Sequence, residues 1–141
     1  MIPLKTLLLT FIGLLMSFSS DKPAYLLFEQ GGKKVTYQEL LKKASQADVV
    51  LFGELHNNPI CHWLELELAK DLWQEKKGNL VLGAEMFEAD IQLVLNEFLS
   101  GKIKENHLET EGKVWINYKT DYSPLVNFAK TKQIPFIATN V

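Results

Sequence analysis

The sequence predicts an α/β protein in which helices flank a parallel sheet, with a small β-hairpin ahead of them. Continuous apolar runs at 49–52, 80–84 and 135–138 are typical of strands that are covered on both faces. Amphipathic segments of helical length separate these runs, as the connections between parallel strands require. The chain has 141 residues, 47% of them hydrophobic and 23% charged, which is enough to bury the core of one domain.

The first twenty residues differ in composition from the rest. Lys5 precedes an almost wholly apolar run at 7–16, and small residues follow at 17–20. This run is short for a membrane span and has the layout of a secretory signal peptide, although an uncleaved anchor or a first strand are alternatives. We expect residues 1–20 to be a leader, residues 21–141 to form the domain, and the protein to be exported to the periplasm or cell envelope.

Charge and cysteine content exclude several classes of function. The net charge is −2 and all 15 basic residues are lysine, so the chain has neither a basic excess for nucleic acid nor an arginine fork for phosphate. Cys61 is the single cysteine, which excludes a disulfide within the chain and a cysteine-rich metal cluster. It does not follow the apolar run of the leader, so the sequence does not support a lipid anchor.

The segment after the leader predicts a hairpin and then a helix. Residues 25–28 and 34–36 flank a Gly-Gly pair, which tolerates the positive dihedral angles of a tight turn. Thr36 and Glu39 form a capping-box pattern, which predicts a helix that continues to about Gln46.

Two further β-α units follow. The predicted strand at 49–52 leads to Asn58 and Pro59, a typical helix start, and that helix continues to about residue 76. Its apolar stripe consists of Ile60, Leu64, Leu68 and Leu72.

The second unit begins with the strand at 80–84, which ends at Glu85. Asp90 is placed to cap the next helix, which stops near residue 101. The segment 102–122 is irregular, with a short helix expected around 103–108. Ser123-Pro124 opens another helix, and the strand at 135–138 ends at Thr139-Asn140.

Polar groups follow each predicted strand at the end where open α/β sheets bind ligands. Glu54 and His56 follow the first strand, Glu85 the second and Asn140 the third. If the first two strands are neighbours, Glu54, His56 and Glu85 converge and are suited to hold a divalent metal or to serve as base and acid around water. The alternative is that these residues cap the following helix or pair with lysines.

Other residues near this site have two interpretations each. Gly53 would let a ligand approach the backbone closely. His62, in the first turn of the helix at Pro59, is either a further ligand or a buried histidine bonded to a carbonyl. Tyr118 and Tyr122 are either ligands of a flat cofactor or part of the core, and for Trp115 we favour covering the edge of the core.

The stretch VVLFGELHNNPICHWLELELAKDL resembles the ChaN-like haem-binding proteins, whose signature is a strand followed by Gly-Glu-x-His, Asn-Pro and a second histidine. The stretches LVLGAEMFE and IPFIATNV are similar to the second and third strands of that family. The resemblance covers about residues 25–141. Because relatives run well beyond the position of Val141, the chain resembles the N-terminal half of the domain.

The resemblance implies haem as the cofactor, a role in haem or iron uptake, and haem held by a tyrosine between the subunits of a homodimer. Tiki-type metalloproteases and erythromycin esterases belong to the same wider group. They imply a hydrolase as an alternative, with catalytic or metal-binding Glu54, His56 and Glu85; a non-enzymatic binding domain is the third interpretation. The positions that match the haem-binding family are Gly53, Glu54, His56, His62 and Glu85, with Tyr118 and Tyr122 as candidates for the haem-ligating tyrosine.

Overall fold

The computed structural model describes residues 22–141, and the predicted leader lies outside them. Contacts divide the chain into two compact units, with the boundary between Lys34 and Val35. At this boundary β1 (Leu27–Phe28) pairs with β2 (Lys34–Val35). The turn is closed by the Glu29 N–H, which donates to the Lys33 carbonyl at 2.9 Å, and Gly32 takes a φ of 80°. The predicted hairpin is therefore confirmed.

Helix α2 (Tyr37–Gln46) begins with the predicted capping box. The Thr36 hydroxyl oxygen accepts from the Glu39 N–H at 3.2 Å, and the Glu39 carboxylate accepts from the Thr36 N–H at 2.7 Å. The Tyr37 hydroxyl then donates to the Asp71 carboxylate on α3 at 2.7 Å, which ties the two helices together.

Helix α3 (Pro59–Glu75) begins where the sequence predicts. The Asn58 side-chain oxygen accepts from the N–H groups of Ile60 and Cys61 at 3.0 and 3.1 Å. The stripe on α3 is largely confirmed, because Leu64, Leu68 and Leu72 are buried and Ile60 is 39% exposed.

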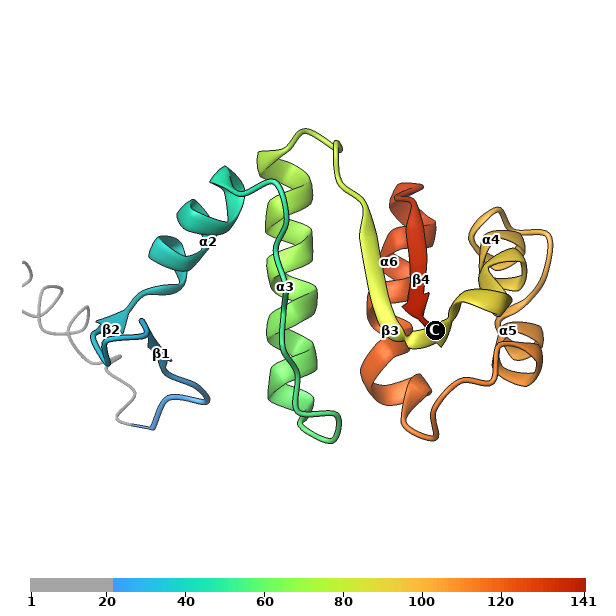
Figure 1. The fold of residues 1–141 in the computed structure, drawn as a ribbon, viewed down its shortest axis with the longest axis horizontal. Helices are drawn as coiled ribbons and strands as arrows, with labels where there is room; N and C mark the ends of the chain where they lie inside the picture. Colours follow the sequence, from blue (N-terminus) through green and yellow to red (C-terminus); the bar gives the residue numbers. More distant parts are fainter. Residues whose placement is uncertain (1–21) are drawn as a thin grey trace, which may run out of the picture. The chain divides into compact units, whose positions relative to one another are not determined.

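The sheet of the larger unit consists of β3 (Leu82–Glu88) and β4 (Phe136–Asn140), which run parallel as predicted. Leu82 pairs with Phe136, and Ala84 pairs with Ala138. Helix α6 (Ser123–Lys132) leads into β4 and begins at the predicted Ser-Pro pair. The two strands stand side by side in Figure 1.

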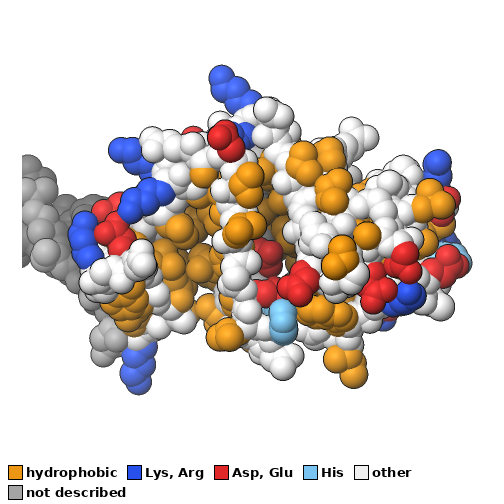
Figure 2. All heavy atoms as spheres, in the orientation of Figure 1, with side chains coloured by type: hydrophobic (Ala, Val, Ile, Leu, Met, Phe, Trp, Pro, Cys, Tyr) orange, Lys and Arg blue, Asp and Glu red, His pale blue; other side chains and the backbone are white. Residues whose placement is uncertain are grey.

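The prediction of a buried strand at 49–52 is wrong. This segment has no strand conformation, and Val49 and Leu51 are 74% and 92% exposed. Among the described residues the sheet of the larger unit contains β3 and β4 alone, so the segment at 49–52 has no hydrogen-bonded partner strand. Figure 2 shows hydrophobic side chains at the surface alongside it.

The segment between the strands holds a 3-10 turn at Ala89–Ile91, α4 (Gln92–Leu99), α5 (Glu105–Glu111) and a π-helical turn at Tyr118–Tyr122. The prediction that Asp90 caps a helix is wrong: Asp90 lies inside the 3-10 turn, where its carboxylate pairs with Lys113 at 3.0 Å.

These elements close one main core against β3 and β4. Among residues 22–141, no helix is both long enough and apolar enough to cross a membrane. The core's largest fully buried side chains are Tyr118, Phe87, Phe98, Phe136, Leu95, Leu108 and Val126.

Candidate functional site

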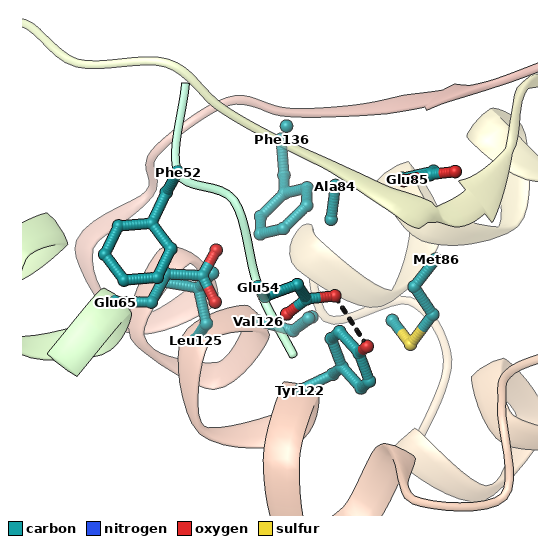
Figure 3. A pocket seen from close by; sticks show the side chains of 11 residues that line it. Phe52, Glu54, Glu65, Ala84, Glu85, Met86, Tyr122, Leu125, Val126 and Phe136 are labelled. Carbon is teal, nitrogen blue, oxygen red and sulfur yellow. Dashed lines mark hydrogen bonds between the residues drawn. The ribbon is translucent and has the colours of Figure 1, made fainter. Parts of the chain in front are cut away.

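Glu54 lies at the centre of a cluster of polar groups in the larger unit. Its side chain is 16% exposed. Oε1 accepts from the Tyr122 hydroxyl at 2.7 Å, the dashed line in Figure 3, and lies 3.0 Å from Nδ1 of His56. Oε2 lies 3.1 Å from Nδ1 of His62. One carboxylate therefore contacts two imidazoles and a phenol.

His62 is the buried imidazole of this cluster, 4% exposed and held by the first turn of α3. Its Nε2 lies 3.1 Å from the carbonyl oxygen of His56 and 4.0 Å from Oδ2 of Asp121. Its ring meets the Tyr122 ring edge-on, with centroids 4.7 Å apart. The structure shows the buried, carbonyl-bonded histidine that was one of the two interpretations, and the other ring nitrogen faces Glu54. A ligand role for His62 stays a prediction.

The segment that contains Asn117 holds the loop that carries Glu54 and His56 in place. The Asn117 amide donates to the His56 carbonyl at 2.7 Å and to Asp121 Oδ2 at 2.8 Å. Trp115 packs against the core as expected. Its ring also contacts the rings of His56 and Tyr122 edge-on, with centroids 4.9 and 5.5 Å apart. The π-helical turn and the loop after residue 53 therefore form one connected site.

Glu65 belongs to the site although the sequence interpretation missed it. Its Oε2 lies 3.9 Å from Nδ1 of His62. Burial, followed by the charge of Glu54, raises the pKa of Glu65 to about 7, and His62 partly opposes this shift. The spacing between His62 and Glu65 could have indicated this, because residues three apart in sequence lie on the same face of a helix.

A cavity of about 80 Å³ borders Glu54 and Glu65 (Figure 3). It has room for a few water molecules but not for a macrocycle such as haem. In Figure 3 the Glu85 side chain points away from Glu54. The cavity is lined by Phe52, Glu54, Glu65, Gly83, Ala84, Glu85, Met86, Tyr122, Leu125, Val126 and Phe136.

The structure brings some of the predicted residues together and separates others. Tyr122 joins the cluster, and burial together with its bond to Glu54 raises its pKa. Tyr118 is buried in the core, where its hydroxyl donates to Glu105 at 3.4 Å, and burial raises its pKa as well. Gly53 is exposed, and a Cβ added there would meet nothing within 4 Å.

Glu85 is exposed on β3, and its role as a ligand or catalyst stays a prediction. The same holds for the ligand roles of Gly53, His56, Tyr118 and Tyr122. The groups that do meet are carboxylates and imidazoles, a donor set suited to transition metals and to proton transfer. The side chain of His56 is 54% exposed, so among the residues of the cluster it is the one that a large ligand can reach.

Residues 40–141 match the family described as "Haem-binding uptake, Tiki superfamily, ChaN". No curated protein and no solved structure matched the chain. The matched region contains every residue of the cluster around Glu54 and spans well over half of the sequence. The chain therefore belongs to the ChaN family of haem-binding uptake proteins in the Tiki superfamily.

Proposed function

We propose that this chain is an exported protein that binds haem, or the iron derived from it, during uptake at the cell envelope. The family match over residues 40–141 is the observation that carries the proposal. Export is supported by Lys5, the apolar run at 7–16 and the small residues that follow.

His56 is the residue best placed to reach the haem iron. Its Nδ1 lies 3.0 Å from Glu54, and its side chain is 54% exposed, so Nε2 is the ring nitrogen left for an outside ligand. Carboxylate support of this kind orients an imidazole ligand and raises its basicity. The raised pKa of Tyr122 disfavours the phenolate form, so a tyrosine ligand would first have to leave Glu54.

In this proposal haem lies on the outer face of the site, beside His56, because the cavity that borders Glu54 has a volume of only about 80 Å³. Gly53 leaves open space on its own side of the loop. A flat ligand on an exposed face loses more contact with water when a second copy of the chain covers it. We therefore include a haem-bridged homodimer in the proposal.

Titration of the folded, full-length protein with haemin tests this function. A saturable Soret shift is expected, and it should weaken or change in His56→Ala. His107→Ala is the matched control, since His107 lies on α5 away from the cluster. Sedimentation velocity should show a dimer that depends on haemin. A folded sample without a saturable Soret shift would remove the proposal, and a shift that changes in Tyr122→Phe but not in His56→Ala would assign the ligand to the tyrosine.

Export is tested separately by the intact mass of protein recovered from the periplasmic fraction. Loss of about the first twenty residues is expected from the layout of the leader. Protein that still begins at Met1 in that fraction, or that remains wholly inside the cell, would contradict export.

A metal-dependent hydrolase is the second candidate, because the cavity beside Glu54 and Glu65 suits water rather than a macrocycle. In this reading Glu54, His56 and Glu85 would activate water. Turnover of simple esters or peptides that is abolished in both Glu54→Gln and Glu85→Gln would favour it. No turnover by the metal-supplemented protein would exclude it for those substrates.

A further inference from the structure

Two hydrogen-bond acceptors face one another inside the site. Glu54 Oε2 and His62 Nδ1 are both buried, and neither has a hydrogen-bond partner, although only 3.1 Å separates them. A buried polar atom without a partner is costly, and two in direct opposition are rare. A proton on Nδ1 or a metal ion between the two atoms would satisfy both of them.

The proton positions around His62 are set by its other nitrogen. Nε2 lies 3.1 Å from the His56 carbonyl oxygen. A carbonyl oxygen can only accept, so Nε2 carries the hydrogen and the neutral ring presents a lone pair at Nδ1. A histidine that donates one N–H to a carbonyl and directs its other nitrogen inward has the arrangement of a metal ligand.

Glu54 is positioned in the same way. Its Oε1 accepts from Tyr122 at 2.7 Å and lies 3.0 Å from His56 Nδ1, so this oxygen already has its partners. The remaining oxygen, Oε2, is held toward His62. Contacts made by one oxygen thus aim the other at the imidazole.

Glu65 completes a set of three. Its Oε2 lies 3.9 Å from His62 Nδ1, and one atom from each of Glu54, His62 and Glu65 lies within 4.8 Å of the other two. The ion pairs of the described residues give both carboxylates histidine partners and no lysine. The cavity of about 80 Å³ borders both glutamates and leaves room for water as a further ligand.

The geometry points to a site for a divalent transition-metal ion, held by Glu54 Oε2, His62 Nδ1 and Glu65 Oε2 and completed by water. Zn²⁺ bonds to nitrogen and oxygen at about 2.0–2.2 Å, so its ligand atoms lie roughly 3–3.5 Å apart. The observed 3.1 Å fits this separation, whereas Glu65 Oε2, at 3.9 Å from His62 Nδ1, would have to move closer when the ion binds. Two carboxylates match the charge of the ion and also suit Mn²⁺, and the imidazole favours Zn²⁺ or Fe²⁺ over Mg²⁺ and Ca²⁺.

This site differs from the proposed haem site, because its ligands are buried or largely buried (3–22% exposed side chains), whereas the His56 side chain is 54% exposed. It also differs from the set Glu54, His56 and Glu85 that the sequence predicts. A metal here would fix Glu54 and, through it, the orientation of the His56 ring. The two sites share Glu54, so haemin binding and binding of a bare metal ion are measured in separate titrations.

Calorimetric titration of the chelator-treated, full-length protein with ZnCl₂ and, in a second series, MnCl₂ tests the site. One ion per chain is expected, confirmed by elemental analysis after desalting. Glu65→Gln should weaken binding at least tenfold, the lower end of the range known for disturbed metal sites. Glu67→Gln is the matched control: it lies on the same helix, paired with Lys70 at 2.8 Å, and should keep the affinity.

A second variant guards against misfolding. The His62→Gln variant should not bind the metal, and its circular dichroism spectrum shows whether the variant folds. If the variant does not fold, the Glu65→Gln result alone tests the site. Glu85→Gln should bind as the wild type does, and a loss there equal to that in Glu65→Gln would overturn this ligand set. Absence of saturable binding, or imidazole ¹⁵N shifts that show both His62 nitrogens protonated and unchanged by the metals, would overturn the site and leave a proton as the cation. A haemin titration of the same samples reports on the haem proposal alone.

Discussion

The buried imidazole of His62 faces the carboxylate of Glu54, with Nδ1 and Oε2 3.1 Å apart and neither atom hydrogen-bonded. Such a pair persists only if surrounding groups hold both side chains in place. On one side these groups are the cap of α3, and on the other the Tyr122 hydroxyl and the Asn117 amide. The supports are separate, so each can be removed by a single substitution.

Removing the cap of α3 should destabilise the fold. Asn58→Ala loses the acceptor for the N–H groups of Ile60 and Cys61, and the free energy of unfolding should fall by about 1 kcal/mol. Urea unfolding followed by circular dichroism measures this loss. Asn57→Ala is the control, because Asn57 is exposed and precedes the cap. Equal losses in the two variants would contradict the capping role.

Removing the Tyr122 hydroxyl should also be costly. Tyr122→Phe leaves Glu54 Oε1 with His56 as its remaining partner, and the free energy of unfolding should fall by about 1–2 kcal/mol because a hydrogen bond to a charged group is lost. The control is Tyr118→Phe. The bond from Tyr118 to Glu105 is longer, at 3.4 Å, and Ser123 and Asn127 also donate to that carboxylate. A larger loss in Tyr118→Phe, measured by urea unfolding, would contradict this ranking.

Glu65 should make stability depend on pH in the chelator-treated protein. The folded state keeps its proton up to about pH 7, whereas the unfolded chain releases it near 4.5. Between these values the folded state binds more protons, so its stability falls as pH rises, and the effect is complete above about pH 7. The Glu65→Gln variant should show a flatter profile in urea unfolding over this range.

Glu75→Gln controls for the loss of a carboxylate on α3, because Glu75 is exposed at the end of that helix. Its profile should follow that of the wild type. If Glu65→Gln has the same slope as Glu75→Gln, the raised pKa of Glu65 is not the cause of the pH dependence.

Two glycines near the site should respond differently to alanine. A Cβ at Gly83 would lie 2.9 Å from the Thr139 side chain and 3.4 Å from the Ile137 carbonyl oxygen, so Gly83→Ala should cost about 1–3 kcal/mol through overpacking between β3 and β4. Gly53→Ala meets open space and should leave the melting temperature nearly unchanged. If haem approaches the loop at Gly53, the same variant should weaken the Soret response. A stable Gly83→Ala protein would contradict the close approach of the two strands.

Local signals in the sequence predicted the starts of α2, α3 and α6 and the parallel sheet. The capping box of Thr36 and Glu39 and the Asn58-Pro59 pair act within one turn of helix, so their effects can be read without the rest of the fold. The apolar runs at 80–84 and 135–138 likewise led to β3 and β4, with bounds shifted by a few residues.

What the sequence could not supply was the identity of neighbours. The run at 49–52 is as apolar as a strand, but a strand also needs a hydrogen-bonded partner, and composition does not report one. The same reason explains why Glu65, which lies beside Glu54 and His62, was missed. Tyr118 and Tyr122 are four residues apart, and only the packing of the π-helical turn decides which phenol meets Glu54.

The bonds that close the site join distant parts of the chain. Tyr122 and Glu54 are 68 positions apart, and Asn117 and His56 are 61 apart. Closing loops of this length costs conformational entropy, so we expect the Tyr122–Glu54 and Asn117–His56 bonds to form late in folding. A nascent or proteolysed chain that lacks the segment after α5 keeps the cap of α3 but lacks the Tyr122 and Asn117 bonds to Glu54 and to the His56 carbonyl. The complete cluster is therefore present only in the folded domain. A ligand that needs the complete cluster binds after folding and does not assist folding.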